Sequence, residues 1–271
     1  MKVALYFGIL LTIIGCNTND SITLNEKPFN PKTGIYLKET FITNQDTLPY
    51  RILYPNNFDA AKKYPVLFFL HGSGERGSDN EKQLTHGGKL FLDSINSYQA
   101  IIVFPQCPQN DYWANIKDRI SDKKLNFDFD FVENIPPTHS LSLLMKLVNN
   151  KIKKPYTDNL RIHIAGLSMG GIGTGQILAM HPELFASGTV ICGAAPIQYA
   201  EKLKQTPTSI YHGNADPVVS VKYGENYYNA IKDDKGTHRI KIFDSVGHES
   251  WNNAFQEKDF LSWIFNHKKQ D

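Results

Sequence analysis

Apolar and polar positions divide the chain into two differently patterned parts. Near the N-terminus, residues 34–43 and 47–54 read as strands and are separated by Asn44-Gln45-Asp46, a turn composition that predicts a β-hairpin. Further on, residues 66–70 and 100–104 are apolar without interruption. Strands that are apolar on both faces are typical of parallel sheets buried between helices. The pattern therefore predicts an antiparallel hairpin followed by buried parallel strands.

Helical and extended patterns alternate over the rest of the chain. Apolar residues recur at helical spacing in residues 141–152, and a strand over 161–165 precedes a second helical pattern that begins near Ile172. Further strands are predicted at 188–192, 208–211 and 238–243, and further helices at 221–231 and 253–267. The alternation predicts an α/β fold with a mostly parallel central sheet and helices on both faces.

The first residues of the chain differ in composition from the rest. The apolar stretch 3–14 follows Met1-Lys2, is too short to span a bilayer, and matches the apolar region of a secretion signal. Its end, Ile13-Ile14-Gly15-Cys16, resembles a bacterial lipobox, in which cleavage precedes a cysteine that becomes lipidated. An uncleaved N-terminal anchor is the alternative.

This resemblance implies three segments. They are a lipoprotein signal peptide over 1–15, a polar tether over 16–33 that begins with the lipidated Cys16, and one domain over 34–271. Either form of anchor places the domain outside the cytoplasm, in the envelope of a bacterium, at the outer membrane or in the periplasm. The lipid anchor is the one membrane contact that we expect.

Composition narrows the range of partners. The 271 residues carry a net charge of +2, with 41% hydrophobic and 21% charged residues, as in an ordinary globular protein. Lys and Arg are scattered, so we expect a small or neutral substrate and no nucleic acid. Cys107 and Cys192 are interpreted as buried thiols, although the sequence leaves their pairing open. Because neither C-x-x-C nor H-E-x-x-H occurs, we expect no metal.

One glycine-flanked serine lies between a predicted strand and a predicted helix. Gly166-Leu167-Ser168-Met169-Gly170 fits G-x-S-x-G, in which small residues flank the serine because the turn is too tight for larger side chains. Such a turn exposes the serine hydroxyl. An ordinary glycine-rich loop is the alternative, so the partners that other segments supply decide whether Ser168 is a nucleophile.

Two later loops supply such partners. A serine hydroxyl becomes an effective nucleophile when a base takes its proton and a third group orients that base. Asp216 follows the strand at 208–211, and His248 follows the strand at 238–243, so the chain order is serine, acid, histidine. Asp244 is the rival acid, but it lies only four residues before His248. The competing histidines, which are less well placed, are His163, His181 and His212.

Ester or amide cleavage also needs donors for a developing oxyanion. The backbone N–H of Met169, directly after the serine, is the first candidate, and that of Ser73, in the loop after strand 66–70, is the second. The same loop, residues 72–77, also matches the dinucleotide fingerprint G-x-G-x-x-G. No apolar helix follows it and the next strand ends without an acidic residue, so we expect no nucleotide cofactor.

The loop over 118–137 has an unusual composition. Phe127, Phe129 and Phe131 alternate with acidic residues ahead of Pro136-Pro137. The phenylalanines are interpreted as the buried face of an edge strand or, alternatively, as part of a flap that faces the substrate.

Several stretches together resemble a known group of proteins. The chain is similar to secreted α/β-hydrolase esterases of the dienelactone-hydrolase-like, phospholipase/carboxylesterase-like and predicted-peptidase groups. The matching stretches cover most of residues 49–265 in order; they are 70–80, 104–108 with Trp113, 161–171, 181–185, 191–196, 212–219 and 246–251. The resemblance implies an α/β-hydrolase fold.

The resemblance also implies residue roles. Ser168 would be the nucleophile, His248 the base and Asp216 the acid that orients it, with Ser73 and Met169 as oxyanion donors.

Three further positions, Gln106, Trp113 and Trp251, resemble residues of the substrate pocket wall, with simple packing as the alternative. The expected activity is that of a serine carboxylic-ester hydrolase without a cofactor, acting on small or carbohydrate-linked esters such as feruloyl or acetyl esters of plant polysaccharide. The alternatives are a serine peptidase of the prolyl-oligopeptidase type and a non-catalytic binding lipoprotein on a hydrolase scaffold.

Overall fold

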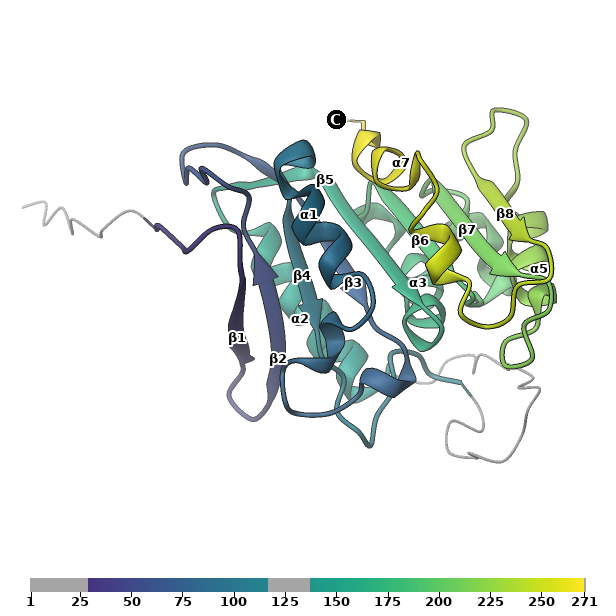
Figure 1. The fold of residues 1–271 in the computed structure, drawn as a ribbon, viewed down its shortest axis with the longest axis horizontal. Coiled ribbons are helices and arrows are strands. Elements are labelled where there is room, and N and C mark those ends of the chain that lie inside the picture. Colours follow the sequence, from purple (N-terminus) through teal and green to yellow (C-terminus); the bar gives the residue numbers. More distant parts are fainter. Residues whose placement is uncertain (1–28, 117–136, 271) are drawn as a thin grey trace, which may run out of the picture.

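An eight-stranded sheet forms the centre of the protein. The computed structural model describes residues 29–116 and 137–270 (Figure 1). The strands are β1 (Tyr36–Ile42), β2 (Thr47–Leu53), β3 (Tyr64–Leu70), β4 (Ile101–Pro105), β5 (Thr157–Leu167), β6 (Ser187–Ile191), β7 (Thr208–Gly213) and β8 (Arg239–Phe243). They lie in the order β1-β2-β4-β3-β5-β6-β7-β8. The β1–β2 and β2–β4 pairs are antiparallel and the remaining pairs are parallel, which confirms the predicted hairpin and the mostly parallel sheet.

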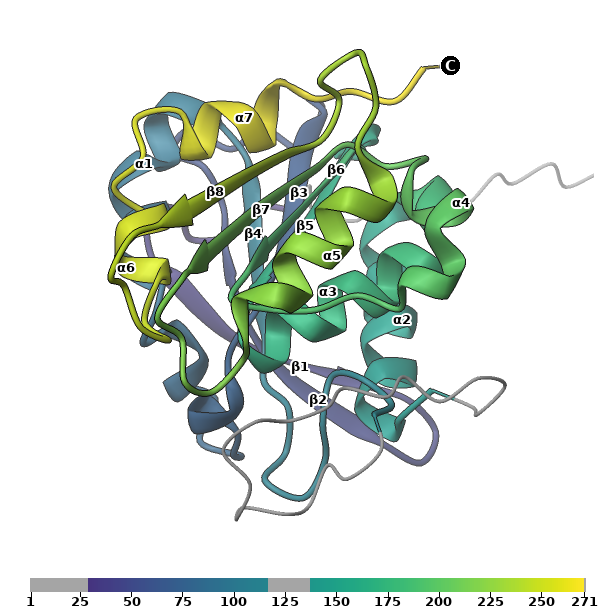
Figure 2. The same cartoon turned by 90° about the vertical axis from the view of Figure 1, so that its right-hand side faces the viewer.

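Helices cover both faces of this sheet. They are α1 (Gly88–Tyr98), α2 (His139–Ile152), α3 (Met169–Met180), α4 (Ala200–Leu203), α5 (Val221–Ile231), α6 (Trp251–Ala254) and α7 (Phe260–Asn266), with 3₁₀ turns η1 (Ser73–Glu75), η2 (Lys82–Leu84), η3 (Pro182–Leu184) and η4 (Ile197–Tyr199). Figures 1 and 2 show α1 and α7 on one face and α2, α3 and α5 on the other. The result is the α/β-hydrolase fold that the sequence predicted.

The apolar run of β3 shows why continuous hydrophobicity marks these strands. Val66 and Phe68 belong to the core cluster under α2, α3 and α5, whereas Leu67 and Phe69 belong to the cluster under α1 and α7. Successive side chains of a strand point to opposite faces, so a strand between two helical layers needs apolar residues at every position. β3 therefore lies at the centre of both cores.

The C-terminal helix prediction over 253–267 is wrong. The chain forms two helices there, α6 and α7, with a turn in which the N–H of Phe260 donates to the carbonyl of Glu257 at 3.0 Å. Phe255 and Phe260 pack against each other with ring centroids 5.4 Å apart. On one continuous helix, residues five apart would point about 140° away from each other. The turn brings both rings to the same core.

Some expectations concern segments outside the described residues. The predicted signal peptide with Cys16, most of the tether and nearly all of the loop over 118–137 lie there. Within the residues that the structure does describe, no helix is both long and apolar enough to cross a membrane. Cys107 and Cys192 are free and buried, which confirms the interpretation as two thiols.

Candidate active site

Ser168 occupies a strained corner between β5 and α3. Its φ is +51° and its ψ is −120°, a backbone conformation that residues other than glycine rarely adopt. A Cβ on Gly166 would lie 2.3 Å from the carbonyl oxygen of Gly170, and one on Gly170 would lie 2.1 Å from that of Leu70. Both glycines are therefore required by close backbone contact, which is the physical content of the G-x-S-x-G pattern.

His248 connects Ser168 with Asp216. Its Nδ1 lies 2.8 Å from Oδ2 of Asp216, and its Nε2 lies 2.9 Å from Oγ of Ser168. Because a carboxylate only accepts, Nδ1 carries the hydrogen and Nε2 is left to accept from the serine hydroxyl. The three residues follow the carboxyl ends of β5, β7 and β8, which lie at the same edge of the parallel sheet. The structure thus brings these three predicted site residues into one hydrogen-bonded chain.

The side chain of Asp216 is fully buried and receives several donors. Its Oδ1 accepts from the backbone N–H of Val218 at 2.8 Å and of Val219 at 2.9 Å. The Nε2 of His212 lies 3.3 Å from its Oδ2, on the same oxygen that His248 contacts. Burial by itself raises the pKa of Asp216, but the hydrogen bonds from His212 and His248 outweigh it and hold that pKa well below its usual range. Asp216 is therefore ionised at neutral pH.

The rival acid, Asp244, has a different contact. It is exposed, and its Oδ1 accepts from Nδ2 of Asn214 at 2.8 Å. The N–H of Ala215 donates to the carbonyl of Val246 at 3.0 Å, so the loops after β7 and β8 are bound to each other. A Cβ on Gly213 would lie 2.2 Å from that same carbonyl oxygen. This close approach of the two loops places Asp216, rather than Asp244, beside His248.

The two nominated oxyanion donors lie in segments that meet next to the serine. Met169 is the first residue of α3, and Ser73 is the first residue of η1, in the loop after β3. A Cβ on Gly72 would lie 3.7 Å from Cβ of Ser168. The N–H groups of a first helical turn have no partner within the helix and lie at its positive end. This arrangement can hold a negative charge beside Oγ of Ser168.

His71 fixes the peptide that carries the Ser73 N–H. Its Nε2 accepts from the N–H of Cys107 at 3.0 Å, so Nδ1 carries the hydrogen and donates to the carbonyl of Gly72 at 2.6 Å. In a trans peptide the N–H of Ser73 points away from that carbonyl, and so away from the imidazole. Burial lowers the pKa of His71 from 6.5 to about 4, so the ring is neutral under ordinary conditions.

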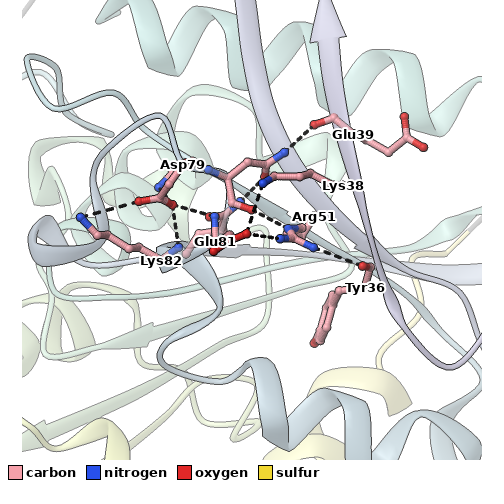
Figure 3. Close-up of polar contacts among 10 residues, drawn as sticks. Tyr36, Lys38, Glu39, Arg51, Asp79, Glu81 and Lys82 are labelled. Carbon is pink, nitrogen blue, oxygen red and sulfur yellow. Dashed lines mark hydrogen bonds and ion pairs between the residues drawn. The ribbon is translucent and has the colours of Figure 1, made fainter.

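A polar network ties the rest of this loop to the N-terminal hairpin. Asn80, which has a φ of +54°, donates through Nδ2 to the carbonyl of Glu39 at 2.9 Å, while Nε of Arg51 donates to the carbonyl of Asn80. Glu81 forms ion pairs with Lys38 at 3.2 Å and with Arg51 at 3.5 Å. Figure 3 shows both side chains directed at the Glu81 carboxylate. The loop that carries Ser73 is thus held to strands β1 and β2.

The three predicted wall residues lie in different places. Gln106 is fully buried; its Oε1 accepts from the N–H of Asn80 at 2.6 Å and its Nε2 donates to Oδ1 of Asp79 at 3.0 Å. Trp113 is fully buried beside the ring of His71. Neither has surface for a ligand, so both follow the packing alternative. Trp251 lies edge-on to the ring of His248, with centroids 5.6 Å apart, and for it the wall role stays a prediction.

One described cluster has the donor types for a metal. Possible ligand atoms of Cys192, Asp216 and His248 lie within 4.8 Å of one another. The Cys192 thiol is wholly buried, and burial raises its pKa, whereas a metal needs the thiolate. Asp216 and His248 are also hydrogen-bonded to each other, so a metal would have to break that bond. The arrangement favours acid–base chemistry.

The contact between His212 and Asp216 was not predicted from the sequence. As a candidate base, His212 is less well placed than His248 because it precedes the acid. The available signal was a histidine close to the end of a strand and four residues before an aspartate.

Comparisons with known proteins identify the family of the chain. Residues 58–264 match the phospholipase/carboxylesterase family. The chain is 24% identical over 209 residues to the carboxylesterase SOBER1 of Arabidopsis thaliana, covering 73% of this chain and 88% of that protein. It is 25% identical over 179 residues to feruloyl esterase B of Neurospora crassa, covering 65% of this chain and 56% of that protein.

A solved structure is also similar to this chain. The crystal structure of a thermostable esterase superposes with a TM-score of 0.75 at 27% identity, over 86% of this chain and 63% of the other. This chain thus spans less than two thirds of that esterase, and likewise of feruloyl esterase B. The family match covers more than half of the chain and includes the elbow serine, the acid and the histidine. The chain belongs to the phospholipase/carboxylesterase family of α/β hydrolases.

Proposed function

We propose that the protein is a serine carboxylesterase that works through an acyl-enzyme. One observation carries the proposal: the His248 imidazole lies within hydrogen-bonding distance of both Oγ of Ser168 and Oδ2 of Asp216. This is the arrangement that a nucleophile, a general base and an orienting acid require. Family membership supports the same class of reaction.

Acylation begins at the serine. Oγ of Ser168 attacks the ester carbonyl carbon while its proton passes to Nε2 of His248, and Asp216 stabilises the resulting imidazolium. The carbonyl oxygen becomes an oxyanion that accepts from the N–H groups of Ser73 and Met169, each of which contributes about 3 kcal/mol. When the tetrahedral intermediate collapses, the C–O bond to the alcohol breaks and His248 returns the proton to the leaving oxygen.

Deacylation repeats these steps with water. His248 takes a proton from a water molecule, the hydroxide attacks the acyl carbon, and the same donors hold the second oxyanion. Collapse breaks the bond to Oγ of Ser168, which regains its proton from His248. The products are one carboxylic acid and one alcohol, and no cofactor takes part.

We propose small or carbohydrate-linked esters as substrates, with feruloyl and acetyl esters of plant polysaccharide as the leading candidates. The resemblance to feruloyl esterase B supports the feruloyl group. The indole of Trp251 beside His248 is suited to contact an aromatic acyl group. A serine peptidase would use the same residues, so it is the alternative that the experiment must separate.

We also propose that the enzyme is anchored in a bacterial envelope through lipid on Cys16. The support is the sequence Ile13-Ile14-Gly15-Cys16 after a short apolar stretch. A polysaccharide-directed esterase at the cell surface would meet its substrate there. Replacing Cys16 with alanine should release the protein from membranes and leave its specific activity unchanged.

Mass spectrometry of released products tests the proposed reaction. The full chain, extracted in detergent, is incubated with feruloylated xylo-oligosaccharides, acetylated xylo-oligosaccharides and an unblocked peptide mixture. Release of ferulate or acetate by the wild type, lost in Ser168→Ala, is the expected result. Peptide cleavage alone would establish the peptidase instead, and no turnover of any substrate would favour a binding protein.

A further inference from the structure

A second histidine contacts the carboxylate of Asp216. His212 is the penultimate residue of β7 and is fully buried. Its Nε2 lies 2.8 Å from the carbonyl oxygen of Val219 and 3.3 Å from Oδ2 of Asp216. Both neighbours are acceptors, so Nε2 carries the hydrogen and shares it between them. The proposed reaction gives this group no step.

The surroundings of His212 leave Nε2 as the one ring nitrogen that donates a hydrogen bond. Among the described residues, its Nδ1 has no hydrogen-bond partner. A Cβ on Gly224, in helix α5, would lie 2.8 Å from that Nδ1, so the ring fits only because residue 224 is a glycine. A hydrogen on Nδ1 would have no acceptor among the described residues. Nε2 alone faces the acid.

The contacts of His212 close a small ring with the turn that carries the acid. The carbonyl of Val219 accepts from His212, and the N–H of the same residue donates to Oδ1 of Asp216 at 2.9 Å. Oδ2 of Asp216 meets both imidazoles. The carboxylate is thus held at both oxygens, and it cannot rotate away from His248 without losing a buried hydrogen bond.

We propose that His212 is a positioning residue for the acid: it holds the Asp216 carboxylate in the orientation in which Oδ2 meets Nδ1 of His248. The inference rests on the proposed function, because it concerns how well His248 serves as base for Ser168. His212 itself does not touch substrate. Its removal should slow reactions of Ser168 without removing the nucleophile.

A fluorophosphonate probe measures this effect without a known substrate. Oγ of Ser168 displaces fluoride from phosphorus, and mass spectrometry of the intact full chain follows the rate of labelling. The variants are His212→Leu, which removes the donor, and His212→Gln, whose terminal amide N–H can take the place of Nε2–H. His163→Leu is the matched control, because His163 is also fully buried in the sheet but bonds to Ser187.

We expect His212→Leu to slow labelling about tenfold to a hundredfold, which is the range for a lost hydrogen bond to a charged group. His212→Gln should recover most of the rate, and His163→Leu should stay within about twofold of the wild type. Equal labelling of the wild type and His212→Leu would overturn the inference and leave the proposed function intact. Absence of labelling in the wild type would instead overturn the proposed nucleophile.

A second variant tests the same inference if His212→Leu fails to fold. Gly224→Ala places a methyl group against Nδ1 of His212. Alanine in place of glycine inside a helix ordinarily stabilises the fold, so slower labelling would come from the displaced ring. We expect a severalfold slower reaction. If His212→Leu does not fold, labelling of Gly224→Ala at the wild-type rate would overturn the inference.

Discussion

The two sides of Ser168 are held in different ways. On the acid–base side, the loops after β7 and β8 present two side chains, and the critical contacts are a few buried hydrogen bonds around Asp216. On the oxyanion side, the loop after β3 presents a backbone N–H. Its position depends on many contacts, several of them at the surface: the side chains of Lys38 and Glu81 are 52% and 66% exposed.

This difference predicts how strongly single substitutions on each side of Ser168 affect turnover. A buried hydrogen bond to a charge contributes more than an exposed ion pair, and a side chain that does chemistry has no substitute. Single changes on the acid–base side should therefore have large effects on turnover. Single changes on the oxyanion side should have graded effects, because the remaining contacts still hold the loop.

Replacing Asp216 with asparagine should have the largest effect. An amide N–H₂ facing Nδ1 of His248 would favour the tautomer that carries its hydrogen on Nε2, and such a ring cannot accept the proton of Ser168. We expect kcat to fall about 10⁴-fold, as measured with the ester that the wild type cleaves best. Asp244→Asn is the matched control in the neighbouring loop, and its kcat should stay within about twofold of the wild type. If Asp244→Asn were the crippling change, the assignment of the acid would be wrong.

Mild acid should destabilise the fold in part through His71, on the oxyanion side. Burial lowers the pKa of His71 to about 4 from an ordinary 6.5, so the unfolded chain binds this proton more tightly than the folded chain. The stabilisation from neutral His71 is complete above pH 6.5 and is lost as the pH falls toward 4, at up to about 1.4 kcal/mol per pH unit. Asp216, whose pKa is well below its usual range, keeps its charge over the same interval.

Urea unfolding at several pH values between 4 and 7 measures this loss. His71→Gln should be less stable than the wild type at pH 7 and should lose less free energy of unfolding on acidification. His163 provides the comparison, because burial also lowers its pKa, to about 3, at a distance from the loop after β3. An unchanged pH slope in His71→Gln would show that another group controls acid sensitivity.

The features that the sequence predicted well are those that depend on local backbone requirements. The buried strands were found from apolar runs, because a strand between two helical layers has no polar position. The corner at Ser168 was found from glycines that close backbone contacts make necessary. The contact of His248 with Asp216 was expected from chain order and from the shared edge of a parallel sheet.

The features that the sequence did not reveal depend on packing between distant segments. Helix α1, which buries Gly88, Phe91 and Ile95, was not predicted. The turn between α6 and α7 depends on Phe255 and Phe260 reaching one core. Gln106 was predicted to line the pocket. A sequence does not show that the hydrogen bonds of a buried amide are all made within the protein.

Replacing Gln106 with leucine should have an intermediate effect, on the oxyanion side. The substitution leaves the buried N–H of Asn80 without its partner and removes one of the donors to Oδ1 of Asp79, which keeps the N–H groups of Glu81 and Lys82. We expect the free energy of unfolding to fall by about 2 kcal/mol and turnover by about tenfold, with the larger loss in kcat. Unfolding in urea and steady-state kinetics on the same preparation measure both. A loss as large as that of Asp216→Asn would contradict the proposed difference between the two sides.

Replacing Glu81 with glutamine should have the smallest effect. Glu81 forms ion pairs with Lys38 at 3.2 Å and Arg51 at 3.5 Å, but its side chain is 66% exposed. Exposed pairs contribute about 0 to 1 kcal/mol and weaken with salt. We expect a loss below about 0.5 kcal/mol that disappears in 1 M salt, and an unchanged kcat. A large, salt-independent loss of kcat would mean that this one carboxylate positions the loop by itself, and the distributed support of the oxyanion side would then be wrong.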